Sequence, residues 1–208
     1  MKKTIFWADQ DTAKTLETSL CSDNVSITST DTILGFLAPL TESGVKKLHA
    51  IKGSRAEKTY ILLVASPAKI SKFVDMSTID DRVQKIMDSF WPGPLTIVFK
   101  ANQDAPSHLV AGDQTIALRC PQHEALRKFL ASFDGLLSTS VNHSGQPAAL
   151  TVDQIPEDIL SAVDCVVIDD LEKPKAAKPS TIIDVSQPGQ IKVLREGALP
   201  VERLALFF

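Results

Sequence analysis

Hydroxyl residues and cations stand at the points where apolar segments of this sequence end. Ser29-Thr30-Asp31-Thr32 follows one apolar segment, and Asn142 follows another. Lysine and arginine neutralise phosphates, and hydroxyl, amide and backbone N–H groups orient them. These residue types therefore indicate a site for an anionic ligand. The residues that could form it are Thr32, Lys52, Ser54, Arg55, Lys58, Arg119, Ser138, Ser140, Asn142, Ser180 and Arg195.

Each group also has a purely structural interpretation, and the residues alone leave the choice open. Residues 29–32 could form only a helix cap or an Asx turn, and residues 52–58 could be a solvated charged face. Arg119 and Arg195 could belong to structural ion pairs, and residues 142–145 could form an ordinary turn. The pattern alone predicts an α/β domain with, at most, a phosphate-binding site.

Signatures of the common nucleotide, hydrolase and metal sites are missing from the sequence. It contains no GxGxxG, Walker A, GxSxG or HExxH segment. The 4 histidines and 3 cysteines show no metal-ligand spacing, so we expect no metal site built from protein residues.

The elements that must position these residues alternate between helical patterns and short apolar runs rich in β-branched residues. Thr41 and Gly53 have the residue types of a helix N-cap and of the position just past a helix end. The expected helices are 9–23, 41–53, 67–74, 79–90 and 123–133, and the expected strands are 25–28, 60–66, 95–101, 115–120, 136–140, 165–169, 181–185 and 191–194. We expect one α/β domain over residues 1–208 with a mixed sheet, whose strand ends meet ligand-binding loops.

The bulk composition is that of a globular protein. The 208 residues allow one large domain, and 44% hydrophobic and 23% charged residues are ordinary values. A net charge of −3 predicts no global attraction to nucleic acid, although a local basic patch stays open. No apolar run is long enough for a signal peptide or a membrane-spanning helix, so we expect a cytoplasmic protein without a membrane partner.

These segments, taken in order, resemble the YrdC-like family. SFWPGPLTIVFKA is similar to the family segment FWPGPLTLVL, and STDTILGF is similar to its PTDTxYG motif. The collinear matches run from about residue 25 to residue 199 and also include LHAIKGSRAEKTYILLVAS, TIALRCPQH, LLSTSVNHSGQPAAL, PSTIIDV and VLREGAL. So many motifs in one order indicate a common fold and common descent.

The resemblance implies a twisted, mixed parallel and antiparallel sheet with flanking helices around a deep, positively lined cavity. It implies that L-threonine and bicarbonate form a carbamate, which attacks the α-phosphate of ATP with the assistance of Mg²⁺. The products are threonylcarbamoyl-AMP and pyrophosphate. A partner complex then transfers the threonylcarbamoyl group to tRNA, which gives N6-threonylcarbamoyladenosine (t6A).

The same resemblance implies roles for particular residues. Lys52 and Arg119 are the candidate catalytic residues, and with Thr32 they are the candidate substrate-binding residues. Thr32 would line the threonine pocket, Arg119 would hold the threonine side of the intermediate, and Lys52 would bind the phosphates or the carbamate carboxylate. Ser54 stands where the family has an arginine, so Arg55 is expected either to replace that arginine or to point into solvent. The candidate nucleotide-binding residues are Arg55, Ser140, Asn142, Ser180 and Arg195.

Two other functions stay open from the sequence. A non-catalytic relative could bind a nucleotide or double-stranded RNA, and the net charge of −3 predicts that RNA binding would be weak and salt-dependent. A carbamoyl-transfer module could use the same adenylate chemistry on another acceptor. We expect this less, because such modules sit in longer chains with zinc-finger and acylphosphatase parts.

Overall fold

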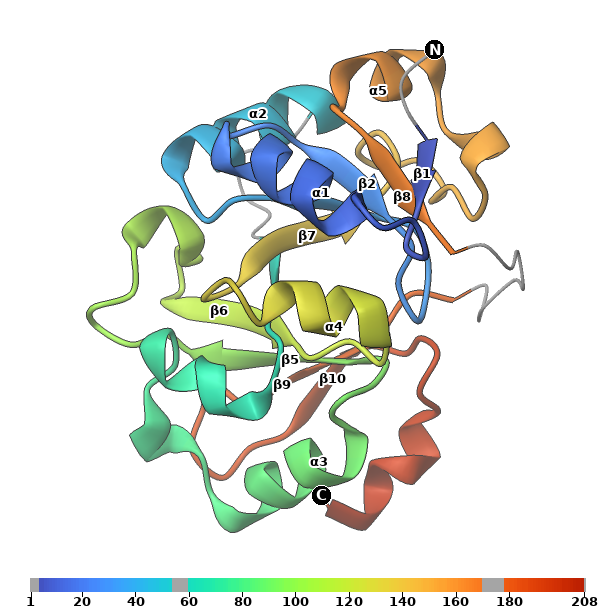
Figure 1. Cartoon of the computed structure of the whole chain (residues 1–208). Coiled ribbons are helices and arrows are strands. Elements are labelled where there is room, and N and C mark those ends of the chain that lie inside the picture. The colour runs from blue at the N-terminus through green and yellow to red at the C-terminus, as the bar shows by residue number, and fades with distance from the viewer. Residues whose placement is uncertain (1–3, 54–59, 170–177, 208) are drawn as a thin grey trace.

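A computed structural model describes residues 4–53, 60–169 and 178–207, and its strands form one mixed sheet (Figure 1). The strand order is β1-β8-β2-β3-β7-β4-β6-β5-β9-β10. The strands are β1 (Thr4–Phe6), β2 (Ser26–Thr28), β3 (Gly35–Ala38), β4 (Ile61–Leu63), β5 (Leu95–Lys100), β6 (Thr115–Arg119), β7 (Leu136–Ser140), β8 (Val166–Ile168), β9 (Thr181–Asp184) and β10 (Lys192–Arg195).

Parallel and antiparallel pairs both occur in the sheet, as expected. β8 lies parallel to β1 and β2, β4 lies parallel to β6, and β5 lies parallel to β9. The remaining neighbours, including β3 with β7 and β7 with β4, are antiparallel. The α/β fold class with a mixed sheet is therefore confirmed.

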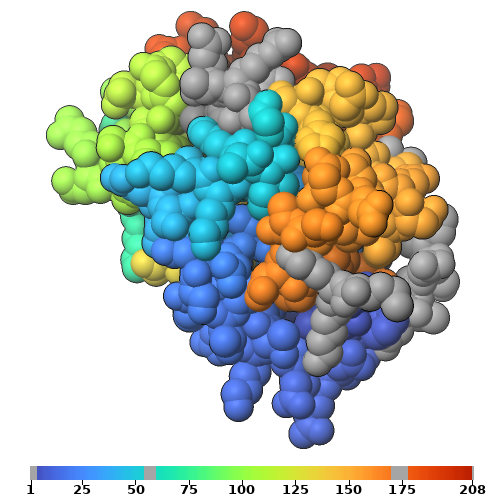
Figure 2. Space-filling view, turned by 90° about the horizontal axis from the view of Figure 1, so that it is seen from above, coloured from blue at the N-terminus to red at the C-terminus, as the bar shows by residue number. Residues whose placement is uncertain are grey.

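Helices cover both faces of the sheet. They are α1 (Thr12–Cys21), α2 (Glu42–Lys52), α3 (Asp81–Phe90), α4 (Glu124–Leu130) and α5 (Glu157–Ala162). Leucines of α1 and α4 pack with Leu37, Leu63 and Leu136 on one face, and Figure 1 shows both helices in front of the sheet. Residues of α2, α3 and α5 belong to the larger core on the opposite face. Seen from above, the segments of α1, α2 and α5 form one continuous end of the molecule (Figure 2).

Helix α2 shows how local sequence sets an element that carries a candidate site residue. The Thr41 side chain accepts a hydrogen bond from the backbone N–H of Gly44, which satisfies one of the free donors at the helix start. Gly53 ends the helix with a left-handed φ of 60°, a conformation that costs glycine little. Both sequence predictions are confirmed, and they place Lys52 in the last turn.

Several sequence predictions need correction. Residues 67–72 form a 3-10 helix rather than an α-helix, and the helix expected at 79–90 begins at Asp81 because Asp80 caps it. Strands β1 and β3 and helix α5 were not expected. Among the described residues, no helix has the length and apolar character needed to cross a membrane.

Candidate functional site

A cavity of about 460 Å³ lies on the sheet face that also carries α1 and α4. Opposite residues in an antiparallel pair point to the same face, and Gly35 pairs with Ser140 while Ile61 pairs with Ser138. The cavity lies within the range of sizes typical of small-molecule sites. Its lining residues are Thr30, Thr32, Ile33, Leu34, Gly35, Ile61, Leu63, Arg119, Ser138, Thr139, Ser140, Asn142, Gln146, Pro147, Ala148, Leu150, Pro179, Ser180 and Arg195.

Small residues on the sheet surface create this hollow. Along β7, Leu136 fills the face beneath the helices, whereas Ser138 and Ser140 occupy the next two positions on that face. Gly35 lies beside them, and a Cβ atom at this position would stand 3.0 Å from Ser138 Oγ. A glycine inside a strand often marks the close approach of a ligand. The sheet face thus changes from packed core to open cavity within a few residues.

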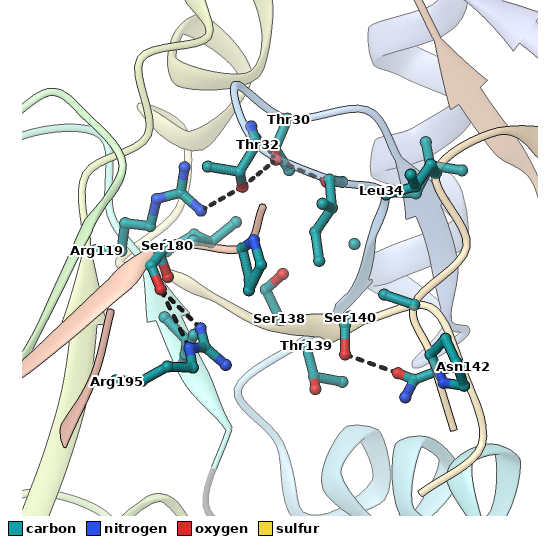
Figure 3. Close-up of a pocket in the computed structure, with 18 of the residues that line it drawn as sticks. Thr30, Thr32, Leu34, Arg119, Ser138, Thr139, Ser140, Asn142, Ser180 and Arg195 are labelled. Carbon is teal, nitrogen blue, oxygen red and sulfur yellow. Dashed lines mark hydrogen bonds between the residues drawn. The ribbon is translucent and has the colours of Figure 1, made fainter. Parts of the chain in front are cut away.

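Arg119, at the end of β6, forms a buried polar corner of the cavity with the loop that follows β2 (Figure 3). Its Nη1 donates to Thr32 Oγ1 at 2.9 Å, and its Nε donates to the carbonyl oxygen of Gly93 at 3.1 Å. Its Nη2 lies 2.5 Å from Asp31 Oδ1, and the two side chains of this ion pair are only 6% and 10% exposed. The guanidinium is therefore fixed in orientation before any ligand binds.

Arg195 lies beside Ser180 on the same side of the cavity as Arg119 (Figure 3). Its Nε and Nη2 both donate to the carbonyl oxygen of Ser180, at 3.2 and 2.8 Å. Partial burial, and after it the charge of Arg119, lowers the pKa of the Arg195 guanidinium, which nevertheless stays protonated at neutral pH. The described lining residues contain these two arginines and no carboxylate, so the wall favours an anion.

Lys52 lies outside the cavity lining and holds the loop that follows β7. Its Nζ donates to the carbonyl oxygens of Ser140 and Asn142 at 2.7 and 3.1 Å, and to Asn142 Oδ1 at 2.9 Å. Ser140 Oγ also donates to Asn142 Oδ1, and Asn142 Nδ2 donates to the Gln146 carbonyl oxygen. The lysine ammonium thus fixes a loop whose side chains line the cavity.

The structure brings most of the candidate site residues together. Those that line the cavity are Thr32, Arg119, Ser138, Ser140, Asn142, Ser180 and Arg195. Lys52 contacts two of them without lining the cavity itself. Ser54, Arg55 and Lys58 lie outside the described residues.

Sequence reasoning missed part of the wall. Leu34 and Gly35 line the cavity from the unexpected strand β3 and the residue before it, and Gln146, Leu150 and Pro179 complete other parts. The glycine between two large apolar residues in LGF was the available signal for Gly35. Nothing in the local sequence marks the other residues.

The described residues offer little to a divalent metal. Among them, no group of three or more histidine, cysteine, aspartate or glutamate side chains could hold a metal ion. Mg²⁺ commonly binds through substrate phosphates with only one or two carboxylates.

Known proteins resemble this chain in sequence and in fold. A protein of Methanocaldococcus jannaschii, provisionally named threonylcarbamoyl-AMP synthase, is 36% identical over 191 residues, covering 91% of this chain and 87% of that protein. The threonylcarbamoyl-AMP synthase of Pyrococcus abyssi is 30% identical over 177 residues, covering 84% of this chain but only 51% of that protein. The structure of Pyrococcus abyssi Sua5 complexed with L-threonine has the same fold, with a TM-score of 0.86, 24% identity and coverage of 99% of this chain and 60% of that one.

A sequence profile described as telomere recombination and named for Sua5, YciO and YrdC matches residues 19–197. The match contains every strand except β1 and all of the residues that line the cavity. The chain therefore belongs to the Sua5/YciO/YrdC family.

Proposed function

We propose that this chain is an L-threonylcarbamoyladenylate synthase. It would condense L-threonine with bicarbonate to a carbamate, with release of water, and a carbamate oxygen would then attack the α-phosphate of ATP. A bond forms between the carbamate oxygen and the α-phosphorus, and the bond to the β-phosphate breaks. Threonylcarbamoyl-AMP and pyrophosphate result.

One observation carries this proposal: a single cavity joins a fixed arginine corner to a second arginine at the end of β10. Transfer of an adenylyl group depends on charge neutralisation and on holding the nucleophile in line, more than on a strong base. Two cations without a lining carboxylate suit a substrate pair that carries a carboxylate and a triphosphate.

The two arginines suggest how the substrates divide between them. Arg119 and Thr32 form the corner proposed for the amino acid, because a fixed guanidinium and a hydroxyl lie together there. Arg195 and Ser180 are proposed to bind the nucleotide. Ser140 and Asn142 line the side of the cavity away from both arginines (Figure 3), on a loop that Lys52 holds.

The relatives support catalysis over the binding-only alternative. Proteins that share 36% and 30% identity with this chain carry the name of the synthase. The Pyrococcus abyssi structure contains L-threonine, which supports threonine as the amino-acid substrate.

Further parts of the proposal concern co-substrates and partners. Bicarbonate would supply the carbamoyl carbon, and Mg²⁺ would arrive as MgATP. The product would pass to a complex that modifies tRNA, so contact with tRNA would be indirect and any direct RNA binding weak. We propose that the protein works in the cytoplasm.

The direct test is incubation of the purified protein with MgATP, labelled bicarbonate and each amino acid in turn. Chromatography with mass detection should show a labelled adenylate with L-threonine and little with other amino acids. ATP binding without any labelled product would favour the non-catalytic alternative. A labelled adenylate formed equally with every amino acid would contradict the assignment of threonine.

Arg195→Ala and Arg203→Ala make a matched pair for this assay. Loss of one charge-assisted contact to the nucleotide should lower kcat/KM for ATP by roughly 10- to 150-fold in Arg195→Ala. Arg203 packs over the Phe90 ring, away from the cavity lining, so Arg203→Ala should keep the activity of the parent. Equal losses in both variants would contradict the placement of the nucleotide beside Arg195.

A further inference from the structure

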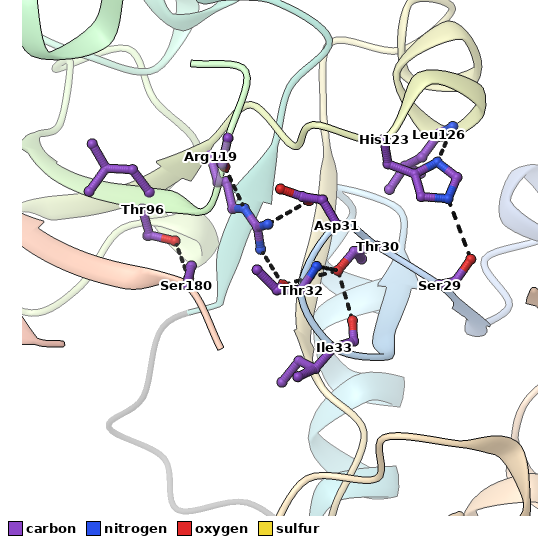
Figure 4. Close-up of polar contacts among 12 residues, drawn as sticks. Ser29, Thr30, Asp31, Thr32, Ile33, Thr96, Arg119, His123, Leu126 and Ser180 are labelled. Atoms are coloured by element: carbon purple, nitrogen blue, oxygen red, sulfur yellow. Dashed lines mark hydrogen bonds and ion pairs between the residues drawn. The ribbon is translucent and has the colours of Figure 1, made fainter. Parts of the chain in front are cut away.

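The hydrogen bonds of the loop after β2 determine which threonine hydroxyl donates and which accepts (Figure 4). Thr30 Oγ1 donates its single proton to the carbonyl oxygen of Ile33 at 2.7 Å. In the 3.1 Å contact between the two threonine hydroxyls, Thr32 Oγ1 must therefore be the donor. The backbone N–H of Thr32 also donates to Thr30 Oγ1, at 3.1 Å, so Thr30 accepts twice and donates once.

The direction of these hydrogen bonds determines whether the Thr32 hydroxyl can donate to a ligand or accept from it. Arg119 Nη1 donates to Thr32 Oγ1 at 2.9 Å, and an arginine cannot accept. Thr32 Oγ1 thus accepts from Arg119 and donates to Thr30, which leaves one lone pair. Because Thr32 lines the cavity, its hydroxyl presents an acceptor there and not a donor.

Asp31 holds the other side of the guanidinium without lining the cavity. Only its Oδ1 contacts Arg119, and its Oδ2 is buried without a hydrogen-bond partner in the described structure. Three of the five N–H groups of Arg119 are used within the described residues, on Gly93, Thr32 and Asp31. One N–H on each terminal nitrogen is left for a ligand.

We propose that Thr30 and Asp31 are positioning residues for amino-acid recognition. Through Thr32 and Arg119 they make the corner present two N–H donors and one acceptor lone pair. The N–H donors of a guanidinium complement a carboxylate, and the acceptor complements an N–H or a β-hydroxyl of the same substrate. This inference rests on the proposed function, since the ligand is the amino-acid substrate of that reaction.

The test compares Thr30→Val with Thr30→Ser and Asp31→Ala with Asp31→Asn in the complete protein. In Thr30→Val the Thr32 proton loses its acceptor and can turn into the cavity, where it opposes a substrate donor. In Asp31→Ala the guanidinium loses its support, whereas the asparagine oxygen of Asp31→Asn can still accept from Nη2. We expect KM for L-threonine to rise about tenfold in the first member of each pair, with KM for ATP changed less than about twofold. The conservative variants should restore most of the threonine affinity.

A parallel series with L-2-aminobutyrate, which lacks the hydroxyl of threonine, separates the two donors. If Thr30→Val raises KM for threonine alone, the Thr32 lone pair accepts from the β-hydroxyl of the substrate. If KM rises equally for both amino acids, the lone pair accepts from the N–H. Either result supports the proposal.

Three results would overturn it. Unchanged threonine KM in all four variants, with an active parent, would refute the positioning role alone. Equal rises in KM for both substrates, in step with lower Tm, would show a merely structural role. A parent that makes no threonine-dependent product would refute the proposed function, and this inference with it.

Discussion

Lys52→Met should destabilise the protein through the loop after β7. The ammonium donates three hydrogen bonds to Ser140 and Asn142 and lies 5.6 Å from the centre of the Phe36 ring. Methionine keeps the length and apolar character of the stem but removes every donor. The loop would then lose these side-chain bonds and keep the backbone hydrogen bond from the Ser144 N–H to the Lys52 carbonyl oxygen, at 3.0 Å.

The size of the effect follows from these contacts. A hydrogen bond from a charged donor contributes about 1.5–3 kcal/mol to stability. The three bonds share one ammonium and the loop acceptors can regain water, so we expect a total loss of about 3 kcal/mol rather than the full sum. At roughly 2–4 °C per kcal/mol for a chain of this size, Tm should fall by roughly 6–12 °C.

Thermal unfolding and steady-state kinetics on the same samples make the assay. Lys47→Met is the matched control, because Lys47 lies on the same helix but is exposed. Its Nζ donates to Asn24 Oδ1 at 3.2 Å and not to the loop after β7. We expect the control to change Tm by less than about 2 °C. If Lys52→Met keeps the parent Tm while its KM for ATP rises strongly, the loop-holding role is refuted and Lys52 is a phosphate ligand.

Three further predictions concern stability. Arg119→Met should lower the free energy of unfolding in urea by about 3–5 kcal/mol, because it leaves the Asp31 carboxylate buried and unpaired. Adding Asp31→Leu should recover most of that loss. Purely additive losses in the double variant would contradict a coupled pair. Burial raises the pKa of Tyr60 to about 12, above the ordinary value of 10.0, so the parent should lose stability as the pH rises from 10 towards 12. The Tyr60 hydroxyl has no hydrogen-bond partner within the described structure, so Tyr60→Phe should be neutral or stabilising at pH 7. In urea unfolding it should also reduce the loss of stability between pH 10 and 12. A marked destabilisation at pH 7 would contradict the absence of a partner. Gly53→Ala should lower stability by about 1 kcal/mol in thermal unfolding because of its left-handed φ, whereas Gly112→Ala, with open space around its Cβ position and no such φ, should not.

Features encoded in neighbouring residues could be predicted from the sequence. The caps of α2, the amphipathic α4 and the apolar runs of β5, β6 and β7 all have local signals, and the structure contains them. The alternation of these elements predicted the mixed α/β sheet. The expectation that cations and hydroxyls at strand ends lie together also gathered residues that line one cavity: Thr32, Arg119, Ser138, Ser140, Asn142, Ser180 and Arg195.

Features that depend on distant pairing could not be predicted. Strand β3 is only four residues long, begins with Gly35 and is followed by Pro39. It exists because β2 and β7 pair with its two edges. The direction of the Lys52 side chain depends on carbonyl oxygens 88 and 90 residues further along the chain. The Asp31–Arg119 pair likewise joins residues 88 apart. Motif position alone cannot distinguish a ligand-binding cation from one that holds a loop.

The most direct measurement of the central claim is pyrophosphate release from MgATP with threonine and bicarbonate omitted in turn. The cavity is proposed to join an amino-acid corner to a nucleotide end, so release should require both omitted compounds and should stop when either is absent. Release that continues at the same rate without threonine, or without bicarbonate, would contradict the account.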